Sequence, residues 1–416
     1  MQWSEWIFWT VVLLLIFDFG FEKWLGHLNH QQWHKSLPAA LKSLYPKEKY
    51  QEAKAYARSN YKMSLLTSAF SFVLILLVLY FGLIGTLDKL VYQWVGESPI
   101  LSALVFFGVA GAISFLINLP FSVYSTFVIE EKFGFNKTNI KTFILDILKS
   151  SLLSIVIGGA ILALIVKLYL IFGSNFWILT WVFLSVLMLF ISMFYSSLIV
   201  PLFNKQTPLE PGELRDKIDS FAQKVGFKLD NIYVIDGSKR STKANAYFSG
   251  LGAKKRIVLY DTLIKDHTAD ELVAVLAHEI GHYKHKHTRS SIIISLLQTG
   301  LMLFLLSLFI APGGAIAEAS ALAFDAKPSF QIGMLIFGIL YSPVSEILGV
   351  MMNWLSRKNE YEADAFAKQH ASAKDLSSAL IKLSKNSLSN INPHPYYVFI
   401  NYSHPPLGYR LARLEE

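Results

Sequence analysis

The sequence contains no cysteine and few charged residues. With no cysteine among its 416 residues, it can form no disulfide bonds and offers no thiolate metal ligands, while the redox compartment stays open. Only 16% of the residues are charged and 53% are hydrophobic, whereas an average soluble domain has about 25% charged residues. The formal net charge is +8, but no basic helix or patch of interleaved basic and aromatic residues is present. The composition therefore indicates a membrane protein with basic loops and argues against nucleic-acid binding.

Long apolar segments occur along most of the chain. A helix needs about 20 mostly apolar residues to cross the hydrocarbon core of a bilayer. The candidate spans are 4–21, 63–85, 100–120, 151–173, 176–200, 291–312 and 330–352. The first lacks the basic start and the cleavage site of a signal peptide, so we expect a retained anchor. Glu346, in the last segment, is expected to face a cavity because a carboxylate is costly in lipid, and a place at the membrane interface is the alternative.

The connections between these segments alternate in charge. Lysine and arginine are frequent after the first, third, fifth and seventh segments, whereas Lys89 and Lys327 are the only basic residues near 86–99 and 313–329. The positive-inside rule then places the basic connections and the C-terminus in the cytoplasm and the N-terminus outside. We expect four regions: an N-terminal membrane domain with five helices, a cytoplasmic insert, two further membrane helices and a C-terminal helical segment. Their bounds are 1–203, 204–290, 291–352 and 353–416.

The cytoplasmic insert has the pattern of a small α/β domain. A stretch with helical spacing is followed by three β-prone runs, NIYVID, ANAYFSG and KRIVLYD, separated by turns rich in glycine and serine. A further helix is expected in TADELVAVLAHEIGHYKHK, with Thr268 as its N-cap and Asp270 and Glu271 in its first turn. Beyond the insert, the alanine- and glycine-rich stretch 311–324 comes nearest to a flexible linker.

The helix after the β-prone runs carries the sequence HEIGH. His278 and His282 lie one turn apart on one face, close enough to bind one Zn²⁺. Glu279 lies beside the first of them, where it can act as a general base on a water activated by the metal. The alternative is an ordinary helix with two exposed histidines. The preceding LVAVLA is apolar, so the helix is packed, and buried imidazoles need partners. The pattern favours a zinc site.

A catalytic zinc normally has three protein ligands and an open position. The segment 356–369 follows the last span on the same side of the membrane and is expected to be a helix, with Glu360 and Asp364 one turn apart and Glu362 pointing away. One of the two neighbouring acids is expected to bind the metal while the other orients a ligand histidine. The spacing does not decide which, and a helix with solvated acids is the alternative.

Two more histidines follow HEIGH. His285 and His287 lie among lysines and an arginine, in the sequence YKHKHTR. We expect them to form a basic rim at the membrane surface, with a secondary metal role as the less favoured alternative.

Six stretches together resemble the type I CAAX prenyl endopeptidases, integral-membrane zinc metalloproteases that include the yeast a-factor-processing enzyme. They are LPFSVYSTFVIEEKFGFNKT, PLFNKQTPLEPGELRDKI, NAYFSGLGAKKRIVLYDTL, LAHEIGHYKHKH, SRKNEYEADAFA and YSHPPLGYR. The resemblance implies an α-helical multispan membrane protein, with about seven transmembrane helices enclosing a chamber and a cytoplasmic α/β zincin-type metalloprotease domain. It also implies one Zn²⁺ per chain, with Glu360 as third ligand and Asp364 in support.

The resemblance extends to residues outside the ligand set. Asn245, Ala246 and Tyr247 match the family's edge strand, to which an extended peptide adds by backbone hydrogen bonds. An ordinary hairpin is the alternative. His404 and Arg410 match residues near the zinc that could supply donors to the tetrahedral oxyanion. For His404 the alternative is a surface turn.

Two features differ from the eukaryotic members. The connection near 313–329 is short, and the final LARLEE has no ER-retrieval signal. Both suit a bacterial member in the inner membrane, whereas a eukaryotic member would lie in the ER membrane. The family activity is removal of the last three residues from a prenylated cysteine, which in a bacterium would be latent. The expected partners are membrane lipid and a peptide or protein substrate that can carry a lipid.

Two other functions are compatible with parts of the sequence. A quality-control protease that degrades misfolded membrane proteins would use the same site chemistry. A metal transporter needs its histidines at membrane depth, but HEIGH precedes its neighbouring span and does not lie within it. The same placement disfavours an intramembrane protease with HExxH inside a hydrophobic span.

Overall fold

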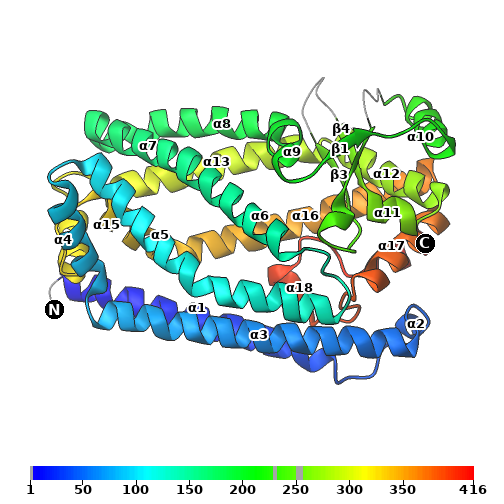
Figure 1. Ribbon diagram of the computed structural model, residues 1–416, viewed down its shortest axis with the longest axis horizontal. Coiled ribbons are helices and arrows are strands. Elements are labelled where there is room, and N and C mark those ends of the chain that lie inside the picture. The colour runs from blue at the N-terminus through cyan, green and yellow to red at the C-terminus, as the bar shows by residue number, and fades with distance from the viewer. Residues whose placement is uncertain (1–2, 228–231, 250–255) are drawn as a thin grey trace.

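The computed structural model describes residues 3–227, 232–249 and 256–416. Long helices run along the molecule, and a small sheet lies at one end of them (Figure 1). The helices up to the sheet are α1 (Trp3–Gln32), α2 (Ala39–Lys42), α3 (Lys47–Tyr80), α4 (Leu83–Val95), α5 (Pro99–Tyr124), η1 (Ser125–Glu130), α6 (Ile140–Leu153), η2 (Ser154–Gly158), α7 (Gly159–Phe172), η3 (Gly173–Asn175), α8 (Phe176–Leu198) and α9 (Val200–Phe203). The later helices are α10 (Glu213–Lys224), η4 (Gly237–Lys239), α11 (Asp261–Asp266), α12 (Ala269–Lys284), α13 (His287–Phe309), α14 (Ala315–Ala323), α15 (Phe330–Leu340), α16 (Ser342–His370), α17 (Ala373–Asn386), α18 (Pro395–Asn401) and α19 (Leu407–Glu415).

The membrane helices correspond to the predicted spans. Among the described residues, five stretches are long and apolar enough to cross a membrane, and α15 with α16 forms a further pair bent by 52°. One of the five, Ile140–Phe203, has 64 residues, far more than the roughly 20 that cross a bilayer. It reverses at η3, so that α7 and α8 pack against each other (Figure 1). This stretch therefore supplies two passes, and all seven predicted spans have helical counterparts.

The outer surface of these helices is apolar. Leu66 of α3, Leu116 of α5 and Val186 of α8 are each about 60% exposed, at 59%, 64% and 62%. Exposed apolar side chains gathered over several helices require lipid as their solvent. The α-helical multispan class is thus confirmed.

A cavity of about 1020 Å³ lies between α1, α3 and α16, and the connection after α17 closes part of it. Phe17, Phe21 and Leu25 of α1 line one wall, and Glu346 of α16 lines another. The expectation that Glu346 faces a cavity is confirmed. A carboxylate can be accommodated there because the cavity also offers polar walls, including Asn29.

The sheet has the strand order β1-β2-β4-β3, with β1 (Gln206–Pro208), β2 (Ile232–Ile235), β3 (Ala246–Ser249) and β4 (Arg256–Tyr260). β2 and β4 are parallel, and the other two pairs are antiparallel. Leu259 of β4 and Leu276 of α12 belong to one buried cluster, so the sheet packs on the helix that carries HEIGH. The three predicted β-prone runs form β2, β3 and β4. β1 was not predicted because three residues show no periodicity.

The expectation of a linker at 311–324 is wrong, because these residues include helix α14. Ala319, Ser320 and Ala321 are buried, and α14 packs against α1 and α15. Alanine has the highest helix propensity, and its small side chain lets helices approach closely. The two glycines of the stretch precede the helix and form only the turn that leads into it.

Candidate active site

Helix α12 begins with a complete capping box. The Thr268 side chain accepts a hydrogen bond from the Glu271 backbone N–H, and the Glu271 carboxylate accepts one from the Thr268 N–H. The helix continues to Lys284 with Leu272, Leu276 and Ile280 buried. The predicted cap, acidic first turn and packed face are all confirmed. Together they fix the direction in which the histidines of HEIGH project.

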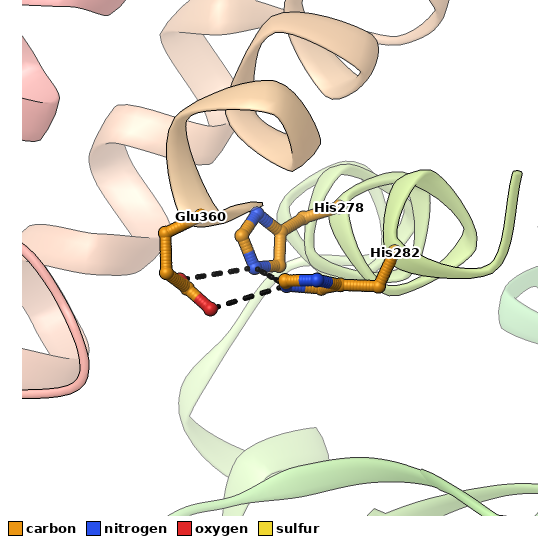
Figure 2. Close-up of side chains that lie close together, drawn as sticks. All are labelled: His278, His282 and Glu360. Atoms are coloured by element: carbon orange, nitrogen blue, oxygen red, sulfur yellow. Dashed lines mark hydrogen bonds and ion pairs between the residues drawn. The ribbon is translucent and has the colours of Figure 1, made fainter. Parts of the chain in front are cut away.

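The two histidines meet the carboxylate of α16 at one point. His278 and His282 bring their Nε2 atoms to 3.1 Å from each other. The Glu360 carboxylate lies 3.5 Å from His278 Nε2 and 3.1 Å from His282 Nε2. Figure 2 shows the two rings and the carboxylate pointing toward one another. The structure thus brings together three of the residues predicted to bind metal, from segments about 80 positions apart in the sequence.

Close packing of α12 on α16 places Glu360. A Cβ atom added at Gly281 would lie 3.0 Å from the Cα of Ala363, a tighter contact than nearly all real Cβ atoms make. Both residues are buried. The glycine inside HEIGH therefore lets the two helices touch through their backbones, one turn from the point where the three side chains converge.

The three side chains fit a tetrahedral zinc site. Ligand atoms about 2.1 Å from a tetrahedral zinc are about 3.4 Å apart, and the separations here are 3.1–3.5 Å. Two imidazoles and one carboxylate form a donor set that zinc prefers. Glu360 Oε2 is buried and makes no hydrogen bond within the described part of the chain. Its nearest neighbours, His278 Nε2 and Arg410 Nη1, are each 3.5 Å away, so the oxygen can still accept a metal ion as a closer partner.

Asp364 lies behind His278, on the side away from Glu360. Its Oδ1 is 2.8 Å from His278 Nδ1, while Arg410 donates to both carboxylate oxygens, at 2.8 and 2.6 Å. Burial alone would lower the pKa of His278, but the hydrogen bonds to Asp364 and Glu360 outweigh it and raise the pKa to about 9. The two carboxylates thus place negative charge on both sides of this ring.

Glu279, the second residue of HEIGH, borders the same site. It lines a pocket of about 550 Å³ together with His278, His282 and Glu360. Burial raises the pKa of Glu279 above its usual value, against the opposing effect of the two histidines. A carboxylate with a raised pKa that touches the pocket but not the ligand cluster is suited to accept and return a proton.

The C-terminal residues approach the site from the far end of the chain. His404 is 64% exposed, and its Nε2 lies 3.4 Å from Glu360 Oε1. Arg410 is buried, with Nη1 3.5 Å from Glu360 Oε2 and the rest of its guanidinium on Asp364. Both line the pocket. The exposure of His404 leaves it free to move toward a substrate, whereas the contacts of Arg410 are those of a residue that holds Asp364.

The predicted substrate-binding residues lie at the rim of the pocket. Asn245 and Ala246 line it, and β3 is an edge strand that pairs only with β4 among the described strands. The Tyr247 side chain turns the other way, toward α8, with its hydroxyl 3.3 Å from Ser196 Oγ. Asn245 folds its own side chain onto the Ala246 N–H. β3 and β4 are antiparallel, but the turn of the hairpin alternative, at GLGA, lies outside the described residues. The other edge of β3 is open among the described strands, and Tyr247 can reach a peptide there only through its backbone.

The expectation of a basic rim is wrong for His287. This residue is 6% exposed, and its ring lies between His282 and Glu362, with 3.0 Å to each. His285 is exposed, as a rim residue would be. Burial of His287 follows from the turn between α12 and α13, which directs the first residue of α13 back toward the site. The sequence signal that could have revealed it is the i, i+5 spacing from His282 across a helix end.

Two cavities adjoin at the site. Ser387, Ser389 and Asn390 line both the pocket of about 550 Å³ and the membrane cavity of about 1020 Å³. The cluster of His278, His282 and Glu360 therefore lies next to a much larger space between the membrane helices.

Comparisons with known proteins agree with this architecture. Residues 27–205 match the family described as "CAAX prenyl protease N-terminal, five membrane helices", and residues 208–416 match "Peptidase family M48". The chain is 36% identical over 422 residues to CAAX prenyl protease 1 of Saccharomyces cerevisiae, covering 96% of this chain and 93% of that protein. It is 34% identical over 422 residues to the CAAX prenyl protease 1 homolog of Homo sapiens, covering 91% and 88%. The crystal structure of S. mikatae Ste24p has a TM-score of 0.92 and 35% identity, with 100% of both chains covered.

Fold and site together define a membrane-embedded metallopeptidase built around a helix-borne HExxH. The chain belongs to the M48 peptidases and, within them, to the CAAX prenyl protease 1 family, as its sequence motifs predicted. The relatives named here are eukaryotic and give no support to a bacterial source.

Proposed function

We propose that this protein is a zinc endopeptidase that releases the C-terminal tripeptide from prenylated CAAX peptides. The observation that carries the proposal is the approach of Glu360 to both histidines of HEIGH, at 3.5 and 3.1 Å. The substrate class is supported by the names of its relatives, which are CAAX prenyl proteases. The ligand set proposed is His278, His282 and Glu360, with one zinc per chain.

Each residue of the site has a defined part in this reaction. The zinc, when bound, supplies a Lewis acid and lowers the pKa of a bound water to about 7. Glu279 takes the proton of the attacking water and later gives it to the leaving amine. His404 donates a hydrogen bond to the oxygen that becomes negative in the transition state. Asp364, held by Arg410, keeps His278 oriented.

The peptide and its lipid would occupy the two adjoining cavities. An extended peptide can pair with the free side of β3 and pass Asn245 and Ala246, which line the pocket beside Glu279. The prenyl chain would extend into the cavity of about 1020 Å³, where Phe17, Phe21 and Leu25 form an apolar wall. Ser387, Ser389 and Asn390, which line both cavities, would border the passage between them.

The same proposal includes the organisation of the chain in the membrane. The membrane parts would be 1–203 and 291–352, and the site would be assembled from 204–290 and 353–416 on the cytoplasmic side. Its support is the basic character of the connections that lie on the side of the sheet. A metal transporter is disfavoured, because α12 is not among the helices that could span a membrane.

A farnesylated CAAX peptide tests the proposal. Purified protein in detergent should release the tripeptide, and Glu279→Gln should lower the rate by about 10²–10⁴-fold while zinc stays bound. Asp270→Asn, on an exposed residue of the same helix, should behave as wild type. Full activity of zinc-loaded Glu279→Gln would exclude Glu279 as the base. Cleavage of unfolded membrane proteins without tripeptide release would favour the quality-control protease.

A further inference from the structure

His282 has a partner on the side of its ring that faces away from Glu360. Its Nδ1 lies 3.0 Å from Nδ1 of His287, and the opposite nitrogen of His287, Nε2, lies 3.0 Å from Glu362 Oε2. The His287 side chain is only 8% exposed. The three side chains form a continuous chain of hydrogen bonds from a carboxylate, through one imidazole, to a proposed metal ligand.

The carboxylate of Glu362, at one end of these hydrogen bonds, determines which nitrogen of each histidine carries a proton. An ionised carboxylate can only accept, so Glu362 requires the proton of His287 to be on Nε2. Nδ1 of His287 is then an acceptor, which requires the proton of His282 to be on Nδ1. Nε2 of His282 is left with its lone pair, and this is the atom that faces Glu360 at 3.1 Å. The carboxylate of Glu362 thus selects the tautomer of His282 that can bind a metal.

The tautomer of His278 is fixed by a carboxylate without an intervening histidine. Its Nδ1 lies 2.8 Å from Asp364 Oδ1, so a carboxylate fixes its proton directly. Both acids lie on α16, two residues apart, and therefore point in different directions. One helix supplies Glu360 to the proposed ligand set and one carboxylate for each histidine of the HEIGH sequence.

The backbone conformation before α13 supports the contact between His287 and His282. Lys286, between α12 and α13, has φ of 60°, in the left-handed region that a lysine rarely adopts. This turn directs His287, the first residue of α13, back onto His282. Strained residues of this kind persist where the surrounding contacts hold them.

A second metal site at this cluster is the competing explanation. Ligand atoms of His285, His287 and Glu362 lie within 4.8 Å of one another. The rings of His285 and His287, however, are stacked with 14° between their planes. The lone pairs of stacked rings lie in nearly parallel planes and do not converge on one ion. The hydrogen-bond chain, in contrast, uses both nitrogens of His287 at 3.0 Å.

We infer that Glu362 and His287 are positioning residues that hold His282 in the tautomer required for zinc binding. The inference rests on the proposed ligand set of His278, His282 and Glu360. Neither residue lines the pocket of about 550 Å³ that holds Glu279 and Glu360, and both act through His282.

Zinc affinity of the purified protein, measured by chelator competition, tests the inference without reference to activity. Glu362→Gln keeps the shape of the side chain but can donate to His287 as well as accept, so it no longer selects one tautomer. Its zinc dissociation constant should rise about 10- to 100-fold. His287→Leu should have the same effect, and His287→Asn should recover part of the affinity, because an amide oxygen can accept from His282 Nδ1.

A charge control separates the tautomer effect from simple electrostatics. Lys358 Nζ lies 3.9 Å from Glu362 Oε1, and the lysine is exposed. Lys358→Gln combined with Glu362→Gln restores the local charge, so it should bind zinc as weakly as Glu362→Gln if the tautomer is decisive. Lys358→Gln alone should bind as wild type. Recovery of wild-type affinity in the double variant would overturn the inference.

Two further results distinguish failure of the inference from failure of the proposed function. Loss of zinc in His282→Ala, with an unchanged dissociation constant in Glu362→Gln, would overturn the role of Glu362 and leave the ligand set intact. Wild-type zinc binding by His282→Ala would overturn the ligand set and the inference together. Since Glu362 is 39% exposed at its side chain, Glu362→Gln is expected to fold even if His287→Leu does not.

Discussion

Gly281 of α12 packs directly on the backbone of Ala363 of α16. A Cβ atom at Gly281 would meet the Ala363 Cα at 3.0 Å and its carbonyl oxygen at 3.1 Å. Both atoms belong to the Ala363 backbone, which cannot rotate away as a flexible side chain can. The two helices would therefore have to separate. Because Glu360 lies one turn before Ala363, this contact sets the distance from the carboxylate to the histidines.

Gly281→Ala should therefore damage the site more than the fold. We expect a loss of about 1–3 kcal/mol from overpacking and a fall in zinc affinity as Glu360 moves outward. Thermal unfolding in detergent and chelator competition measure the two effects. Gly111→Ala, on α5 with nothing within 4 Å of the new methyl group, is the matched control and should change neither. Unchanged zinc affinity in Gly281→Ala would contradict the role assigned to this contact.

Arg410→Lys should weaken the site through Asp364. The guanidinium forms two hydrogen bonds with Asp364, at 2.8 and 2.6 Å, and a lysine cannot reproduce this fork. Breaking a buried ion pair costs about 3–5 kcal/mol when one charge is left without a partner, and Lys retains part of that energy. We expect a lower melting temperature and zinc binding weakened about tenfold.

Arg413→Lys is the control for this substitution. Arg413 lies on the same helix, is exposed and stacks on Tyr361, away from the proposed metal ligands. It should leave zinc affinity unchanged. Equal zinc affinities for the Arg410→Lys and wild-type proteins would show that Asp364 orients His278 without help.

Glu271 should make the folded protein sensitive to acid. Burial alone would raise the pKa of this carboxyl, but Lys382, Ser378 and the capping contact at Thr268 lower it to about 2. A folded-state pKa below the ordinary 4.5 stabilises the protein above pH 4.5, and the stabilisation is lost as the pH falls toward 2. It amounts to at most about 3 kcal/mol.

Glu271→Gln should accordingly unfold at a lower temperature than wild type at pH 7. The difference between the two melting temperatures should shrink between pH 4.5 and pH 2. Asp270→Asn, in the same helical turn but exposed, serves as the comparison and should change the melting temperature little. If the difference in melting temperature between Glu271→Gln and wild type stayed constant down to pH 2, the assigned pKa would be wrong.

The local features of the site could be predicted from the sequence, and the pairings between distant residues could not. The spacing of His278 and His282, the cap at Thr268 and the apolar face of α12 are properties of one continuous helix, so the residue pattern specifies them. The candidates for a third ligand were also local, because Glu360 and Asp364 share a helix. Which of them faces the histidines depends on the rotation of α16 about its axis, and that is set by the contact at Gly281.

Other pairings depend on tertiary packing in the same way. Arg410 and Asp364 are 46 positions apart, and His287 and Glu362 are 75 apart, so no periodicity connects them. The sequence correctly predicts that Glu362 points away from Glu360. Its partner, His287, lies on another helix and could not be predicted. The helix α14 was missed because an alanine-rich stretch with glycines at its start has the composition of a linker, while its burial against α1 is a tertiary property.

The absence of cysteine makes the orientation of the chain directly measurable. Glu97 follows α4 and Lys265 lies in α11, and the two helices are at opposite ends of the molecule (Figure 1). Both residues are exposed. The positive-inside rule places Lys265 in the cytoplasm and Glu97 on the other side. Single substitutions Glu97→Cys and Lys265→Cys would each introduce a unique thiol into an otherwise thiol-free protein.

A membrane-impermeant maleimide applied to intact cells should label Glu97→Cys when the protein lies in the surface membrane. Lys265→Cys should react only after the membrane is permeabilised, and the unsubstituted protein should not react under either condition. If the protein lies in an internal membrane, sealed microsomes with their cytoplasmic face outward should give the reverse pattern. Labelling of both thiols from one side would contradict the topology, because the odd number of spans between them requires Glu97 and Lys265 to face opposite compartments.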